Sequence, residues 1–260
     1  MSKVRHVLGV SGGKDSAALA IYMRDKVPEM EYFFTDTGAE LPEVYTFLDR
    51  LEGYLNKPIA RLNTERPFEH ILEFQYNGFL PSASTRWCTT EMKIKPFEKW
   101  IGDDETISYI AIRADEDRGG YRATKPTITA KFPFKEDGLV RDDIDRLLKQ
   151  SGVGWPEYYK WRSRSGCYFC FFQRKSEWVS LAEEHPDLFE RAKQFEKEDS
   201  GSGNRFTWSQ GETLDELVAR ASDIKAMVAN KSKNAKRLSW QESLALDEES
   251  EEQSCLICEL

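Results

Sequence analysis

The stretch VLGVSGGKDSAALAIYM, residues 7–23, joins an apolar run to a helix-like pattern through a glycine-rich turn. Gly12 and Gly13 lack a Cβ atom, so backbone N–H groups at this turn can converge on an anion. A helix that begins after the turn adds the positive end of its dipole. The turn is shorter than the common GxxxxGK[ST] loop, which has four residues between its first glycine and its Gly-Lys pair. The stretch therefore predicts a phosphate site of another kind.

The side chains of this turn suit the same role. Lys14 supplies a mobile positive charge, and the hydroxyl groups of Ser11 and Ser16 can donate hydrogen bonds to phosphate oxygens. Asp15 has the oxygen ligands that Mg²⁺ prefers, so it can help to position that ion. The alternative is a strand-to-helix turn that contains glycine and binds no ligand.

The pattern around the turn alternates between strands and helices. Strands are expected at residues 4–10, 31–38, 57–63 and 106–113, and helices at 15–25, 41–55, around 67–76 and at 89–101. This rhythm predicts an α/β fold with a Rossmann-like, open and mostly parallel sheet. Ligands of such folds bind beyond the carboxyl ends of the strands. The polar clusters SGGKDS, TDTGAE and RADEDRGGYR follow three of the expected strands.

The alternation stops after about residue 135. We therefore expect a nucleotide-binding α/β domain at 1–135, a smaller helical, cysteine-containing region at 136–246 and an acidic tail at 247–260. Helices are expected at 140–152, at two segments that meet before Pro186, and at 212–231. An aromatic group includes Trp155, Tyr158, Tyr159 and Trp161. We predict that it forms the core of the second domain, the alternative being a surface that stacks on nucleic-acid bases.

Composition and charge limit the classes of function. The chain has 260 residues and a net charge of −8, which argues against strong nucleic-acid binding by this chain alone. Nucleic acid can still reach it through a partner. No run approaches the about 20 consecutive apolar residues of a membrane span. The first residues lack the features of a signal peptide, so a cytoplasmic location is expected.

Five cysteines occur at three places in the chain. Cys88 stands alone, Cys167 and Cys170 form one CxxC pair, and Cys255 and Cys258 form another. Two such pairs can hold zinc or an iron–sulfur cluster. Gly166 permits a tight turn, and the neighbouring Arg162 and Arg164 are expected to stabilise thiolates. The alternative is that the cysteines are inert.

The motif SGGKDS resembles the PP-loop of ATP pyrophosphatases, which cleave ATP between its α and β phosphates. Relatives in that superfamily include phosphoadenosine phosphosulfate (PAPS) reductases, tRNA thiolation enzymes and the adenylating component of DNA phosphorothioation systems. Four further stretches resemble the PAPS reductase-like branch: FTDTGAELPEVYTFLDRL, RWCTTEMKIKPFEKWI, AIRADEDRGGYR and RSGCYFCFF. The matches follow one another from residue 11 to about residue 198.

The resemblance implies an adenine nucleotide alpha-hydrolase-like fold and assigns roles to individual residues. The implied nucleotide-binding residues are Ser11, Gly12, Gly13, Lys14, Asp15 and Ser16 for the phosphates, with Asp36, Thr37 and Gly38 beside the adenosine. The implied catalytic residues are Lys14, Asp15, Arg113 and Arg118. Arginine suits this role because its guanidinium group can form two hydrogen bonds with phosphate oxygens.

The resemblance also implies a [4Fe–4S] cluster, with Zn²⁺ as the alternative. The implied ligands are Cys88, Cys167, Cys170 and Cys258, with Cys255 as an alternative fourth ligand. Reductases that hold the cluster carry tandem cysteines where this chain has Trp87 and Cys88. Their C-terminal Glu-Cys-Gly-Leu-His motif also differs from SCLICEL, in which one cysteine could instead carry sulfur. Both departures count against a reductase.

The implied function is an ATP pyrophosphatase that uses ATP and Mg²⁺ to adenylate a substrate oxygen before sulfur replaces it. The closest resemblance is to the DNA phosphorothioation component. The implied partners are a cysteine desulfurase as sulfur donor and DNA-binding subunits of a modification complex. The alternatives are a PAPS or APS sulfonucleotide reductase, a tRNA thiolation enzyme and a non-catalytic nucleotide sensor.

Overall fold

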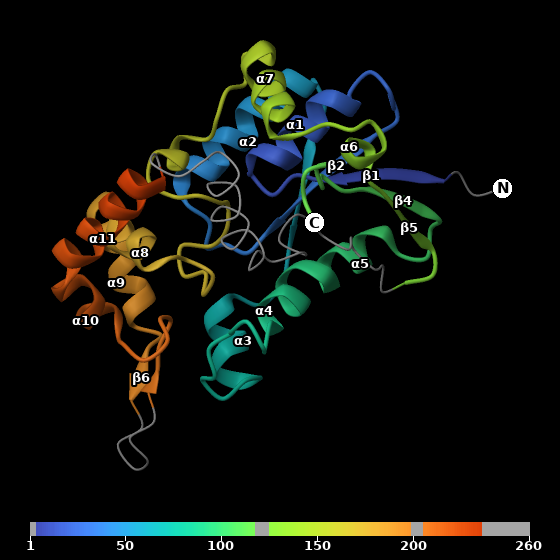
Figure 1. Cartoon of the computed structure of the whole chain (residues 1–260). Helices are drawn as coiled ribbons and strands as arrows, with labels where there is room; N and C mark the ends of the chain where they lie inside the picture. The colour runs from blue at the N-terminus through green and yellow to red at the C-terminus, as the bar shows by residue number, and fades with distance from the viewer. Residues whose placement is uncertain (1–3, 118–124, 199–204, 236–260) are drawn as a thin grey trace. The chain divides into compact units, whose positions relative to one another are not determined.

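A computed structural model describes residues 4–117, 125–198 and 205–235 of the chain. The described residues form two compact units: 4–68, 87–117 and 125–167 belong to the first, and 69–86, 168–198 and 205–235 to the second (Figure 1). Arg118, Cys255, Cys258 and the expected tail at 247–260 lie outside the described residues. The expected boundaries at residues 135 and 246 stay predictions.

The first unit contains a five-stranded sheet in which all neighbours are parallel. Its strands are β1 (Arg5–Gly9), β2 (Glu31–Asp36), β3 (Ile59–Asn63), β4 (Thr106–Tyr109) and β5 (Ile128–Lys131), in the order β3-β2-β1-β4-β5. This topology confirms the predicted α/β, Rossmann-like class. The sequence analysis missed β5, because its four residues form an edge strand too short for a clear alternating pattern.

Helices surround this sheet. Those of the first unit are α1 (Lys14–Met23), α2 (Pro42–Leu55), α4 (Trp87–Thr89), α5 (Lys95–Ile101), α6 (Pro133–Glu136) and α7 (Arg141–Ser151), while α3 (Phe68–Phe74) lies almost entirely in the second unit. A π-helical turn, η1 (Thr90–Ile94), connects α4 to α5, and a 3₁₀ turn, η2 (Glu157–Lys160), follows α7. Phe68, the first residue of α3, belongs to the first unit, and residues 69–74 of this helix belong to the second unit.

Alternating side chains of β2 divide the core of the first unit between two faces of the sheet. Phe33 stacks on Phe97 of α5, with ring centroids 4.7 Å apart, in a cluster that includes Val7 and Leu62. The next residue, Phe34, contacts the ring of Tyr45 on α2. α5 and α2 therefore cover opposite faces, and the sheet has apolar neighbours on both sides.

The second unit is mainly helical. It contains α8 (Lys175–Glu184), α9 (Pro186–Lys193), α10 (Leu214–Ala219), α11 (Ala221–Ala235) and an antiparallel ribbon of β6 (Lys197–Glu198) and β7 (Arg205–Phe206). The single helix expected at 212–231 is two helices, because Arg220 leaves the helical conformation at φ −112° and ψ 27°. The aromatic core of the second unit includes Phe169, whose ring stacks on that of Trp208.

No helix in the described ranges is both long and apolar enough to cross a membrane.

Candidate functional site

The turn at residues 11–16, which we call the phosphate cradle, lies between the carboxyl end of β1 and the first turn of α1. Its serine hydroxyl groups form hydrogen bonds with other groups of the turn. The Ser11 N–H donates to Ser16 Oγ at 3.1 Å, and Ser16 Oγ donates to the carbonyl of Gly13 at 3.2 Å. The Gly13 N–H approaches Ser11 Oγ at 3.4 Å. The serines therefore shape the turn, and its role as an anion site stays a prediction.

Gly12 is required by both conformation and space. Its φ of +76° is in the left-handed region, and a Cβ atom placed on it would lie 2.6 Å from Val44 Cγ1. Any other residue would force Val44, which is fully buried on α2, out of position. The glycine thus lets the cradle pack against α2, a role that the sequence analysis did not foresee.

An aromatic segment, residues 155–162, contacts the cradle within the first unit. The hydroxyl group of Tyr158 donates to the carbonyl of Gly12 at 2.8 Å, and burial raises the pKa of Tyr158 well above its usual value. The Lys14 N–H donates to the hydroxyl oxygen of Tyr159 at 3.3 Å. The prediction that these aromatics form the core of the second domain is wrong, since Tyr158 is fully buried in the first unit.

Arg113, which follows β4, is buried among carboxylates. Its guanidinium group forms ion pairs with Asp15 at 3.0 Å, Asp115 at 2.9 Å and Glu116 at 2.8 Å. Burial lowers the pKa of Arg113, but these carboxylates outweigh that effect and raise it above its usual value. The structure therefore brings Arg113 and Asp15 together, with Arg113 holding the Asp15 carboxylate in place. The catalytic roles expected of both residues stay predictions.

Helix α7 packs against α1 and adds an acidic group that sequence reasoning missed. Burial raises the pKa of Asp145, and the positive charge of Lys14 lowers it. The two side chains are thus within electrostatic reach of one another. VRDDIDRLL contains three aspartates, and nothing in its pattern distinguishes Asp145 from the other two.

A second turn, residues 36–40, follows β2 and is dominated by carboxylates; we call it the acidic turn. Asp36 accepts hydrogen bonds from the Gly38 N–H and the Tyr45 hydroxyl group, both at 2.8 Å. Thr37 donates to Glu40 Oε1 at 2.9 Å. The other Glu40 oxygen, Oε2, has no hydrogen-bond partner among the described residues. Asp36, Thr37 and Gly38 are therefore gathered at one strand end, as the motif predicts.

Glu40 is a buried carboxyl group that sequence reasoning missed. Burial raises the pKa of Glu40, while the charge of Lys93 and the hydrogen bond from Thr37 act in the opposite direction. Lys93 is itself buried and belongs to the π-helical turn η1. π-Helical turns are rare in proteins, and many of those that occur lie at functional sites. The sequence could not predict that Glu40 and Lys93 interact, because more than 50 positions separate them.

Cys167 lies beside the acidic turn. Its Sγ atom is 3.1 Å from Thr37 Oγ1 and 3.6 Å from Glu40 Oε1. Arg162 donates to the carbonyl oxygens of Gly166 and Cys167, at 3.0 and 2.9 Å. These bonds hold the backbone around the cysteine, whereas the sequence analysis expected Arg162 to stabilise the thiolate.

The cysteines were tested as ligands of a cluster or of zinc. Cys88 and Cys167 belong to the first unit and Cys170 to the second. Within 4–117, 125–198 and 205–235, no three His, Cys, Asp or Glu side chains are grouped to hold a metal ion. Cys255 and Cys258, the expected fourth ligands, lie outside the described residues, and the cluster stays a prediction.

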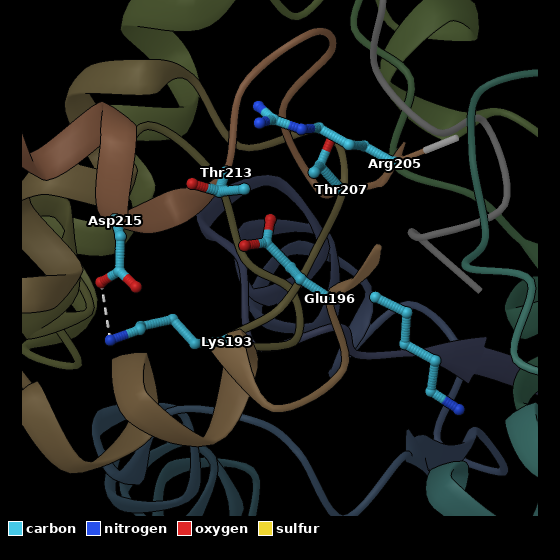
Figure 2. A pocket seen from close by; sticks show the side chains of 7 residues that line it. Lys193, Glu196, Arg205, Thr207, Thr213 and Asp215 are labelled. Carbon is cyan, nitrogen blue, oxygen red and sulfur yellow. Dashed lines mark ion pairs between the residues drawn. The ribbon is translucent and has the colours of Figure 1, made fainter. Parts of the chain in front are cut away.

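A pocket of about 230 Å³ in the second unit is lined by charged residues (Figure 2). Lys193 pairs with Asp215 at 2.6 Å across one side of it. The carboxylate of Glu196 accepts the N–H groups of Trp208 and Leu214, at 3.1 and 2.9 Å. Lys193 and Glu196 thus bind another side chain or the backbone of this unit, and these bonds connect α9 and the residues that follow it to α10 and to the segment at Trp208.

Comparison with known proteins agrees with this geometry. Residues 5–146, more than half of the chain, match the phosphoadenosine phosphosulfate reductase domain. The chain therefore belongs to the phosphoadenosine phosphosulfate reductase domain family. This family is enzymatic and uses nucleotide substrates.

Individual relatives are distant from this chain. Two uncharacterized proteins of Methanocaldococcus jannaschii are 26% and 23% identical over 197 and 238 residues, 71% and 86% of this chain. The chain spans 40% and 55% of their lengths. An uncharacterized 37.8 kDa protein of Escherichia phage 186 is 26% identical over 259 residues, with 74% of each chain covered.

A solved structure shares the fold. The PAPS reductase of Candida auris, solved as a phosphate complex, is 11% identical with a TM-score of 0.50. The match covers 64% of this chain and 82% of that protein.

Proposed function

We propose that this chain is an ATP pyrophosphatase that adenylates a substrate oxygen so that sulfur can replace it. The single observation that carries this proposal is the phosphate cradle, in which Lys14 and the first turn of α1 meet at the end of β1. Membership of a family that uses nucleotide substrates supports it. The departure at Trp87 from the tandem cysteines of cluster-containing reductases supports ATP over a sulfonucleotide.

The proposed chemistry has two steps. A substrate oxygen attacks the α-phosphorus of ATP, and pyrophosphate leaves. A sulfur nucleophile then displaces AMP, which carries the original oxygen away. Lys14 and the N-terminal N–H groups of α1 would stabilise the negative charge that develops on the leaving pyrophosphate. Mg²⁺ would neutralise further phosphate charge when it is bound.

Arg113 has a positioning role in this proposal. Its guanidinium group is 4% exposed and paired with three carboxylates, one of which belongs to Asp15 at the start of α1. Asp15 held in this way keeps a fixed orientation at the start of α1. The cradle then presents one mobile cation and one fixed anion to the nucleotide and its metal ion.

The substrate that we propose is DNA, with a phosphorothioate as the modified group. The net charge of −8 fits a chain that receives DNA from DNA-binding subunits, and a cysteine desulfurase would supply the sulfur. The motif resemblance to the adenylating component of DNA phosphorothioation systems supports this choice.

The test is pyrophosphate release from ATP, with Mg²⁺ and double-stranded DNA, by the wild-type chain and by Lys14→Ala. We expect release by the wild type and a loss of about 100-fold or more in Lys14→Ala, the usual effect of removing one group that stabilises a developing anion. The control is Lys26→Ala, which removes an exposed lysine paired with Asp137. Equal release by Lys14→Ala and wild type would reject the proposal.

A sulfonucleotide reductase is the second candidate, because the family description names PAPS reductase. Incubation with PAPS and reduced thioredoxin separates the two functions. Sulfite release from PAPS without pyrophosphate release from ATP would replace the first proposal by the second. Pyrophosphate release that depends on tRNA and not on DNA would keep the chemistry and change the acceptor.

A further inference from the structure

Lys14 offers two groups to an anion, and the aromatic segment binds both of them. The backbone N–H of Lys14 donates to the hydroxyl oxygen of Tyr159. The side-chain Nζ lies 5.1 Å from the ring centroid of Trp155, a cation–π contact. An electron-rich oxygen and an electron-rich ring thus occupy the positions in which a phosphate group would interact with this residue.

The segment is fixed to the cradle by bonds that do not involve Lys14. Tyr158 is fully buried and donates to the carbonyl of Gly12 at 2.8 Å, and Ser165 Oγ approaches Ser11 Oγ at 3.3 Å. The rings of Tyr158 and Tyr159 stack, with centroids 4.8 Å apart. Trp155 and Tyr159 therefore sit on an anchored support, and they can leave Lys14 by local side-chain movement.

The two contacts with Lys14 are weak enough to be displaced. The 3.3 Å between the Lys14 nitrogen and the Tyr159 oxygen is longer than the usual N–H···O bond. Trp155 is 41% exposed, so part of its ring already faces solvent. Hydrogen bonds to an anionic phosphate oxygen are shorter and about twice as strong as those to a neutral hydroxyl group.

We propose that Trp155 and Tyr159 determine the affinity of the cradle by competing with the bound phosphates for Lys14. The inference rests on the proposed function, since it takes the cradle as the phosphate site. A phosphate group at the cradle would engage the N–H and the Nζ of Lys14 in place of the hydroxyl group of Tyr159 and the ring of Trp155. The aromatic pair thus lowers the affinity of the cradle for phosphate groups.

The experiment is calorimetric titration of the full chain with inorganic pyrophosphate and with orthophosphate. Tyr159→Phe removes one hydroxyl group and keeps the stacked ring, and we expect it to bind both anions about two- to tenfold more tightly. Trp155→Leu should bind both anions about two- to fivefold more tightly. The matched control is Tyr22→Phe, which loses a surface hydroxyl bond from the far end of α1 to Asp137.

Tryptophan fluorescence gives a second readout. Pyrophosphate should change the emission of the wild-type chain as Trp155 leaves Lys14, and this change should be absent in Trp155→Leu. Weaker or unchanged binding in Tyr159→Phe, or identical emission changes in both chains, would overturn the inference.

Lys14→Ala separates the inference from the function on which it rests. If this variant loses pyrophosphate binding and the aromatic variants bind like the wild type, only the inference fails. If Lys14→Ala binds pyrophosphate as the wild type does, the cradle is no phosphate site, and both proposals fail.

Discussion

The phosphate cradle and the acidic turn occupy equivalent places in the fold and have opposite charge. They follow β1 and β2, which are neighbouring parallel strands, so both lie at the carboxyl edge of the sheet. The cradle presents backbone N–H groups, hydroxyl groups and Lys14. The acidic turn presents Asp36 and the buried Glu40.

This difference shows that a strand end supplies a place for a site, while local side chains decide its ligand. In the proposed function the cradle binds phosphates, and a buried carboxylate would repel them. The acidic turn instead contacts the thiol of Cys167 through Thr37 and Glu40. Adenosine binding beside Asp36, Thr37 and Gly38 stays a prediction.

The largest expected effect is that of removing the buried guanidinium group of Arg113, which follows β4 and pairs with Asp15 of the cradle. Arg113→Met leaves Asp15, Asp115 and Glu116 without their shared partner, and we expect a loss of about 3–5 kcal/mol in the free energy of unfolding. Urea unfolding followed by circular dichroism measures this loss. Arg146→Met is the control, because its surface pair with Asp143 should contribute no more than about 1 kcal/mol. Equal losses in both variants would show that the buried pairs are unimportant.

The next effect compares the glycines of the two turns directly. Gly12→Ala suffers both an unfavourable φ and a clash with Val44, so we expect a loss of about 2–4 kcal/mol. Gly38→Ala has a similar φ of +70° and no atom within 4 Å, so only about 1–2 kcal/mol should be lost. Thermal unfolding of the two variants tests the difference. A loss as large for Gly38→Ala as for Gly12→Ala would contradict the role of Val44.

A smaller effect tests the bond between the aromatic segment and the cradle. Tyr158→Phe leaves the buried carbonyl of Gly12 without the hydroxyl donor, and we expect a loss of about 1–2 kcal/mol in the free energy of unfolding. Denaturant titration beside Tyr22→Phe, whose bond is exposed, makes the comparison. Indistinguishable midpoints for the two variants would count against this anchor.

The smallest effect is a pH dependence of the acidic turn. Because burial raises the pKa of Glu40, the folded chain keeps this proton to a higher pH than the unfolded chain does. Stability from this group therefore falls as pH rises above the unfolded value, by no more than about 1.4 kcal/mol per pH unit. Glu40→Gln should lack this fall when unfolding is measured from pH 4 to pH 8.

Thr37→Val provides the matched variant for the acidic turn. Its missing hydroxyl group no longer stabilises the Glu40 carboxylate, so the fall in stability should extend to higher pH than in the wild type. If Glu40→Gln and Thr37→Val both showed the wild-type dependence of stability on pH, Glu40 would not be the cause of that dependence.

Sequence reasoning found the elements with strong local patterns. The order of strands and helices up to β4 and the place of the glycine turn follow from apolar periodicity and Gly12. It missed β5, whose four residues carry too little pattern, and the ribbon of β6 and β7, whose strands have two residues each. It also assigned the aromatic segment to the wrong unit, because aromatic residues indicate burial without saying against which neighbour.

The sequence by itself determined the parallel α/β class and the position of the glycine turn after the first strand, since both depend on residues close together in the chain. Only the tertiary structure decided which distant side chains meet there. Tyr159 reaches Lys14 across 145 positions, Arg113 reaches Asp15 across 98, and Cys167 reaches Glu40 across 127. Such pairs depend on the packing of the whole unit, and no local pattern encodes them.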